Sequence, residues 1–127
     1  MRPSFMALVF LGGGLGSVCR YLLSTAIQRA APGPFPLGTF TVNVVGCFAV
    51  GFVGALGLER AALSPDTRVF LMVGILGGFT TFSSFAWETL GLLSVKDVLR
   101  AGFYVGGSVA LGLLGALLGR ALGRMGG

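Results

Sequence analysis

The sequence predicts an all-α membrane protein in which four transmembrane helices form a single domain over residues 1–127. Hydrophobic residues make up 54% of the chain and charged residues only 10%, and the mean hydropathy is +0.92. Four apolar segments follow one another with short connections, and each is close to the roughly 20 residues that cross a bilayer. These segments are residues 5–26, 38–58, 69–93 and 98–119.

Basic residues lie at the ends of these segments and give the chain a formal charge of +5. They form no stripe, so a membrane-flanking role is favoured over nucleic-acid binding. The cations divide almost evenly between the two predicted sides of the membrane, and this weak bias permits insertion in both orientations. Two copies can then pair head to tail. One side carries Arg2, Arg60, Arg68, Arg120 and Arg124, and the other carries Arg29, Lys96 and Arg100.

The composition provides little material for enzymatic chemistry. The chain contains no histidine, and its two cysteines, Cys19 and Cys47, fall inside apolar segments, where cysteine usually acts as a small hydrophobic residue. The sequence contains no Cys-x-x-Cys pair and no clustered carboxylates for metal hydrolysis or for acid–base or Cys/His catalysis. We therefore predict that the protein is not an enzyme.

The first segment, residues 5–26, combines a packing face with a charged residue. Gly12 and Gly16 form a GxxxG face on which another helix can approach closely. Arg20 lies further along the same segment, and an arginine within a membrane helix usually faces a cavity or a partner. This position makes Arg20 a candidate for an electropositive entrance to an ion path. Alternatively, Arg20 lies less than two turns from residue 26 and can snorkel to the interface.

The second segment begins after the proline-rich stretch at residues 31–37, which ends the first helix. Thr39 and Asn43 are four residues apart and therefore share one face of the second helix. The Asn43 amide needs a polar partner in hydrocarbon, and a neighbouring helix can supply one. The amide can instead direct its N–H donors at an anion, because uncharged donors bind an anion without trapping it.

The third segment contains the sequence GILGGFTTFSSF at residues 74–85, which predicts a break in the helix near residues 77–81. Two adjacent glycines and a β-branched pair disfavour a regular helix, whereas hydrocarbon forbids unpaired backbone groups. A break must therefore face protein, water or an ion, and its free carbonyls suit an alkali cation. The alternative is a kinked helix whose serines and threonines bond back to the preceding turn.

Aromatic and acidic residues follow this predicted break. Phe82 and Phe85 are three residues apart and lie near each other on one helix face. Core packing is the ordinary explanation for such a pair, but the positive edges of the rings can also replace water around a small anion. Glu88 lies one turn beyond Phe85, either at the membrane interface or at the mouth of a pore.

The fourth segment carries a second set of glycines. Gly115, Gly119 and Gly123 form a repeated GxxxG face, which favours tight helix association. Tyr104 and Ser108 are four residues apart and can extend a polar track along the other side of this helix. The competing explanation is that these two hydroxyls bond internally.

Three motifs together resemble the signature of the small fluoride channels of the Fluc or CrcB family. This resemblance covers nearly the whole chain and implies an antiparallel, dual-topology homodimer with two fluoride pores and a central structural sodium ion. It also implies passive export of fluoride across a bacterial inner or plasma membrane, which protects the cell from fluoride toxicity. The motifs are GGGLGSVCRY at residues 12–21, FPLGTFTVNVVGCF at 35–48 and GILGGFTTFSSF at 74–85.

The resemblance also implies roles for individual residues. The family's sodium site corresponds to the backbone carbonyls of Gly77 and Thr80, contributed by both copies. Its phenylalanine box corresponds to Phe82 and Phe85, and its pore asparagine to Asn43. Ser84 stands where the family commonly has threonine, so the hydroxyl is kept and a methyl group is lost. The family's polar track would run through Thr81, Ser84, Tyr104 and Ser108, and Arg20, Thr39 and Glu88 are further candidates for the fluoride pathway.

Two other functions compete with this interpretation. Small drug or cation exporters also have four short helices and dual topology, but they need a carboxylate within the membrane. Glu88 is the sole candidate for that carboxylate. The second alternative is a scaffold without transport activity that uses its glycine faces only for assembly.

Overall fold

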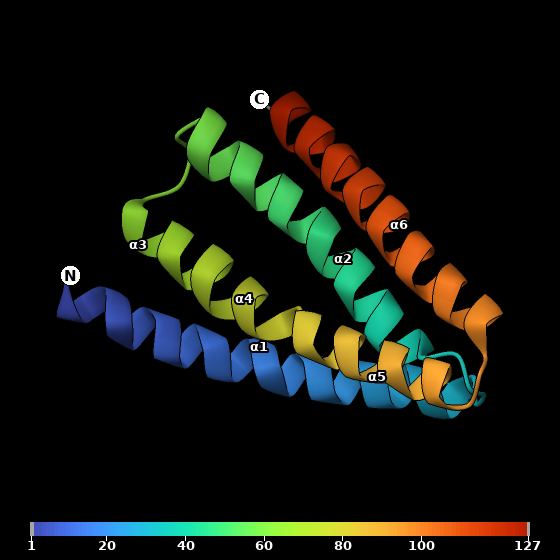
Figure 1. Cartoon of the computed structure of the whole chain (residues 1–127). Helices are drawn as coiled ribbons and strands as arrows, with labels where there is room; N and C mark the ends of the chain where they lie inside the picture. Colours follow the sequence, from blue (N-terminus) through green and yellow to red (C-terminus); the bar gives the residue numbers. More distant parts are fainter. Residues whose placement is uncertain (1, 127) are drawn as a thin grey trace.

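The computed structural model describes residues 2–126, which form four helical passes, each long and apolar enough to cross a membrane (Figure 1). The predicted all-helical fold with four passes is therefore confirmed. The first pass is α1, Pro3–Ala30, and the second is α2, Leu37–Gly54, which continues into the π-helical turn η1, Ala55–Glu59.

The third pass is assembled from several helical pieces, and the fourth is one continuous helix. Both α1 and the fourth pass contain 28 residues, or about 42 Å at 1.5 Å per residue. They extend beyond the predicted 5–26 and 98–119 because their terminal turns, which carry arginines, remain helical. The third pass comprises α3, Pro65–Arg68, η2, Val69–Leu76, α4, Gly77–Phe79, and α5, Phe82–Ser94, and the fourth is α6, Val98–Met125.

The four passes associate as two close pairs. Helix α1 lies along the third pass, and α2 lies along α6 (Figure 1). The start of α1, the connection between η1 and α3, and the end of α6 lie toward one end of the molecule. Arg2 pairs with Asp66 at this end, and Arg60 donates to Gly123 O. The structure thus groups the N-terminal, η1–α3 and C-terminal arginines, as the predicted order of the passes requires.

Glycines allow α2 and α6 to touch at the level of their backbones. A Cβ atom added at Gly119 would lie 2.0 Å from Phe48 O, and one added at Gly51 would lie 2.1 Å from Ala116 O. Both distances are far below any van der Waals contact. The glycine face predicted on the fourth segment therefore packs against α2.

The contact between α1 and the third pass is equally close. A Cβ atom at Gly16 would lie 2.0 Å from Ile75 O, and one at Gly78 would lie 2.4 Å from Gly13 O. The GxxxG face of the first segment thus packs against η2 and α4. Gly78 is required by this close approach.

Gly119→Ala should destabilise the protein, whereas Gly102→Ala on the same helix should not. Both changes gain similar intrinsic helix propensity, but only Gly119 faces the α2 backbone, and a Cβ at Gly102 would meet nothing within 4 Å. Overpacking of this kind typically costs about 1–3 kcal/mol. Thermal unfolding in detergent, followed by circular dichroism, measures the difference. Equal midpoints for the two variants would contradict the proposed backbone contact.

Candidate functional site

The third pass is interrupted at two threonines. Helix α4 ends at Phe79, Thr80 and Thr81 are extended with φ/ψ of −84°/155° and −149°/118°, and α5 begins at Phe82. The interruption lies within the predicted range of residues 77–81, but Gly77 and Gly78 remain helical. Gly78 serves the contact with α1, so the change in backbone direction occurs after α4. Thr80 Oγ1 does bond back to Leu76 O at 3.0 Å, as the kinked-helix alternative expects.

The side chain of Asn43 pairs with the extended backbone of Thr81. Thr81 N donates to Asn43 Oδ1 at 2.8 Å, and Asn43 Nδ2 donates to Thr81 O at 2.9 Å. In a continuous helix the Thr81 N–H would donate to the carbonyl of Gly77. The Asn43 pair therefore leaves Gly77 O without its helical donor.

The Thr81 side chain removes the helical donor of a second carbonyl, that of Thr80, by binding the Ser84 N–H. Its Oγ1 accepts from Ser84 N at 3.2 Å and so caps the start of α5, and it also donates to Ser84 Oγ at 3.1 Å. A continuous helix would direct the Ser84 N–H to the carbonyl of Thr80. The two carbonyls predicted to bind sodium, those of Gly77 and Thr80, are thus both deprived of their helical donors.

Arg20 donates a hydrogen bond to a third carbonyl at the interruption, that of Gly78. Its Nε donates to Gly78 O at 3.1 Å, and Ser17 Oγ donates to the same oxygen at 3.5 Å. A cation near the C-terminal end of a helix is favoured by the helix dipole, and α4 ends at Phe79. Arg20 therefore turns into the protein and supports the interruption.

An open groove of about 360 Å³ lies beside the interruption. It is formed by side chains from α2, the third pass and α6, and most of its surface is apolar. The groove brings together five of the seven residues that the sequence predicts for the fluoride pathway and both residues of the predicted sodium site. Those residues are Asn43, Gly77, Thr80, Thr81, Phe82, Phe85 and Ser108.

The two predicted phenylalanines lie together on one wall of this groove. The ring centroids of Phe82 and Phe85 are 5.5 Å apart, and the Phe85 ring also packs on Tyr104 at 5.1 Å. Phe85 is partly buried, whereas the Phe82 side chain is 81% exposed. A single chain therefore leaves the groove open on the side of Phe82.

Two uncharged donors near the rings have hydrogen-bonding capacity to spare. The Ser108 hydroxyl is buried and has no hydrogen-bond partner among residues 2–126. Asn43 Nδ2 carries two hydrogens and donates one of them to Thr81 O. The predicted alternative, in which both hydroxyls bond internally, holds for Tyr104, which donates to Glu88 Oε2, but not for Ser108, whose hydroxyl has no partner in the described part of the chain. A buried hydroxyl without a partner is costly, so Ser108 is a strong candidate for contact with a ligand.

Glu88 joins two of the predicted residues beyond the rings. Its Oε1 accepts from Thr39 Oγ1 at 2.7 Å, and its Oε2 accepts from the fully buried Tyr104 hydroxyl at 2.8 Å. Thr39 and Glu88 also line a second hollow of about 740 Å³, together with Arg29. Phe85, Tyr104 and Glu88 therefore form a continuous series of contacts from the groove to this hollow.

Sequence reasoning did not identify two residues that shape the site. Ser17 contacts the same carbonyl as Arg20, and its position three residues earlier on the same helix face could have revealed it. Gln28 donates to Gly33 O at 3.3 Å and to Phe35 O at 3.2 Å, and it accepts from Gly38 N at 3.1 Å. It thus fixes the loop before Thr39, and its only sequence signal was its place beside the proline-rich turn.

Comparison with known proteins decides the family. A family profile described as "CrcB-like protein, Camphor Resistance (CrcB)" matches residues 7–120. This chain belongs to the CrcB family. The resemblance found in the sequence is thereby confirmed. Since curated relatives of this chain are named as channels, the chain is a multi-pass membrane protein of a channel family, not an enzyme.

Curated members of the CrcB family match this protein over almost its full length, and the following three all carry the name "Fluoride-specific ion channel FluC". The protein from Nitratidesulfovibrio vulgaris is 50% identical over 120 residues, which cover 94% of this chain and 97% of the relative. The one from Thermus thermophilus is 51% identical over 116 residues, 91% of each chain. The one from Solibacter usitatus is 48% identical over 122 residues, 92% of this chain and 96% of the relative.

Arg20→Met should destabilise this CrcB-family protein more than Ser17→Ala does. Methionine keeps an unbranched side chain but cannot donate to Gly78 O, and a hydrogen bond from a charged group is worth about 1.5–3 kcal/mol. The Ser17 bond is at the distance limit, so its loss should have a smaller effect. The free energy of unfolding in detergent measures both variants. An unchanged value for Arg20→Met would contradict the assigned role of Arg20.

Proposed function

We propose that this CrcB-family protein is a fluoride-selective channel that exports fluoride passively across a bacterial inner or plasma membrane and protects the cell from fluoride toxicity. The names of its relatives support this function. The structural observation that carries the proposal is the buried hydroxyl of Ser108, which finds no partner within residues 2–126 and lies in the groove that Asn43, Phe82 and Phe85 also line. An anion is a natural acceptor for such a donor.

The mechanism follows from the strong hydration of fluoride. A pore must replace bound water with close donors, but it must not hold the ion so tightly that the ion cannot leave. The free N–H of Asn43 and the hydroxyl of Ser108 are uncharged donors, and the ring edges of Phe82 and Phe85 add weak positive potential. Thr81 and Ser84 extend this polar surface beside the rings. Net flow would follow the electrochemical gradient of fluoride.

The rest of the pathway leads toward the second hollow. Tyr104 contacts Phe85 and donates to Glu88, which also accepts from Thr39. These donors neutralise part of the repulsion between the carboxylate and an approaching anion. Arg29 lines the second hollow and gives its mouth a positive charge.

An antiparallel homodimer with dual topology would complete the groove. Phe82 and Gly77 are both exposed in the single chain and line the open groove, so a second copy can cover them. The nearly balanced distribution of cations supports insertion in both orientations. A two-fold axis in the plane of the membrane would then bring the two interruptions together.

A structural sodium ion fits the backbone at the interruption. The carbonyls of Gly77 and Thr80 have lost their helical donors to Asn43 and Thr81, and hard cations prefer such oxygens. With both copies present, four carbonyls would be available. A bound sodium ion would supply positive charge that satisfies these oxygens and holds the two copies together.

Liposomes containing the purified protein should release fluoride rapidly and chloride hardly at all, as measured with ion-selective electrodes. Phe82→Ile and Phe85→Ile should each slow fluoride release by about tenfold or more, since one lost contact of about 1.4 kcal/mol corresponds to tenfold. Phe10→Ile is the matched control, because Phe10 is an exposed ring on α1 outside the groove.

Three outcomes of this experiment would contradict the channel proposal. Release of chloride as fast as fluoride would contradict the proposed fluoride selectivity. A folded preparation that releases neither ion would favour the scaffold without transport activity. Loss of transport in Glu88→Gln, with normal transport in both phenylalanine variants, would favour the exporter. Asn43→Ala should reduce fluoride release, and unchanged release would limit Asn43 to holding the helices together.

Replacement of sodium by N-methyl-D-glucamine during purification should weaken the dimer and reduce fluoride release. The bulky cation cannot enter a site built from backbone carbonyls. Size-exclusion chromatography measures the dimer, and liposome efflux measures transport. An intact, fully active dimer without sodium would contradict the sodium site but leave the channel proposal standing.

A further inference from the structure

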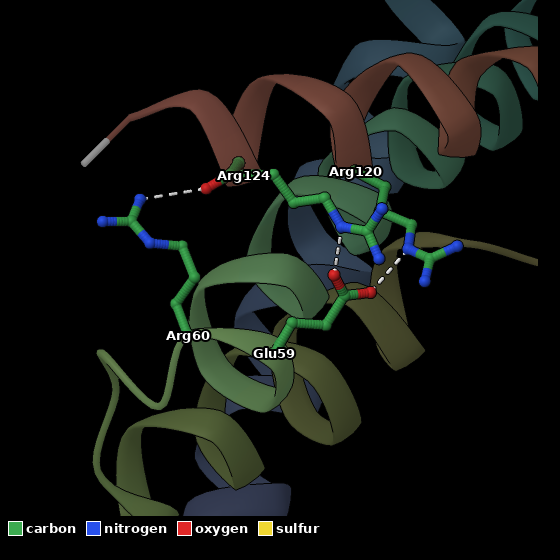
Figure 2. A network of polar contacts seen from close by, with 5 residues as sticks. Glu59, Arg60, Arg120 and Arg124 are labelled. Atoms are coloured by element: carbon green, nitrogen blue, oxygen red, sulfur yellow. Dashed lines mark hydrogen bonds and ion pairs between the residues drawn. The ribbon is translucent and has the colours of Figure 1, made fainter.

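A group of charged side chains joins the end of η1 to the end of α6. Glu59 lies between two arginines of α6, and Figure 2 shows its two carboxylate oxygens each facing one guanidinium. Arg120 Nε donates to Glu59 Oε1 at 2.5 Å, and Arg124 Nε donates to Glu59 Oε2. Arg60 lies nearby and donates through Nη1 to the carbonyls of Gly123 and Gly126.

This group carries more positive charge than its own carboxylate can balance. Three guanidinium groups, those of Arg60, Arg120 and Arg124, accompany the single carboxylate of Glu59, which leaves a surplus of two positive charges. The side chains of Arg120 and Arg124 are 49% and 53% exposed. Both bond Glu59 through Nε, so their Nη donors remain available, and the planar fork of arginine matches the oxygens of a phosphate.

The position of these arginines indicates the kind of phosphate. Arg120 and Arg124 lie one turn apart near the end of α6, and the exposed Leu113 and Leu117 precede them on the same helix stripe. Because α6 is longer than the hydrocarbon core, its last turns can reach the headgroup layer, and the exposed leucines would then lie beside acyl chains. A free phosphate would contact the guanidinium groups but make no use of the adjacent leucine stripe.

We propose that Arg120 and Arg124 bind the phosphate of an anionic phospholipid whose acyl chains lie along Leu113 and Leu117. Glu59 accepts only from the Nε atoms of the two guanidinium groups, so their Nη donors stay available to the phosphate. Arg60 adds positive potential beside the site. This site is separate from the proposed ion pathway, and its test does not depend on transport.

Native mass spectrometry of the delipidated full-length protein tests the site directly. Dioleoyl phosphatidylglycerol should bind wild type at least tenfold more tightly than dioleoyl phosphatidylcholine, which has the same acyl chains but no net charge. The double variant Arg120→Gln/Arg124→Gln should bind phosphatidylglycerol roughly 30-fold more weakly, at about 1 kcal/mol for each arginine. Lys96→Gln/Arg100→Gln is the matched control, since it removes two cations near the opposite end of α6, and it should bind as wild type.

A further variant separates lipid binding from the stability of the charged group. Glu59→Gln keeps both arginines and removes the competing carboxylate, so phosphatidylglycerol binding should be retained or tightened. Weaker binding in Glu59→Gln, or equal losses in the two double variants, would overturn the proposal. Complete competition by inorganic phosphate would indicate a site for free anions and would also overturn the assignment to a lipid.

Discussion

The paired hydrogen bonds between Asn43 and the backbone of Thr81 constrain the whole site. An asparagine side chain carries the same donor and acceptor groups as a peptide unit, so it can pair with an extended residue as a neighbouring strand would. The Asn43 side chain pairs with the backbone N–H and C=O of Thr81, and the part of the chain that the structure describes contains no strand that could do so. The same pair directs the Thr81 N–H away from Gly77 and sets the point at which α5 restarts with Phe82.

Close packing by glycine makes the rest of this arrangement possible. Gly16 brings α1 against Ile75, and Arg20, one turn later, reaches the carbonyl of Gly78. In the same way, Gly119 brings α6 against α2, and these two helices contribute Ser108 and Asn43 to the groove. Asn43, Arg20 and Ser17 thus supply hydrogen bonds to the interruption. The carbonyls of Gly77 and Thr80 have lost the donors that they would have in a continuous helix. The close packing of the helices brings Arg20 and Asn43 within hydrogen-bonding distance of the interrupted backbone.

Local signals predicted the four passes, the interrupted region, the two glycine faces and the pairing of Phe82 with Phe85. These features depend on composition and on the helical period, which a single sequence contains. The exact position of the interruption could not be predicted. In the sequence, Gly77 and Gly78 are the expected helix breakers, but both are helical because Gly78 packs against the backbone of α1. The bonds of Glu88 to Thr39 and Tyr104 depend on the register between helices, as does the Glu59 cluster. That register is set by the packing of helices that are far apart in the sequence, and local sequence patterns do not contain this information.

The most direct test is an experimental density map of the full-length protein, purified in sodium chloride and embedded in lipid. The map should resolve Thr80 and Thr81 as extended backbone, with the Asn43 amide bonded to Thr81 and the carbonyls of Gly77 and Thr80 directed at a common density peak. A continuous α-helix from Gly77 through Phe85, with the Asn43 amide turned away from Thr81, would contradict the account.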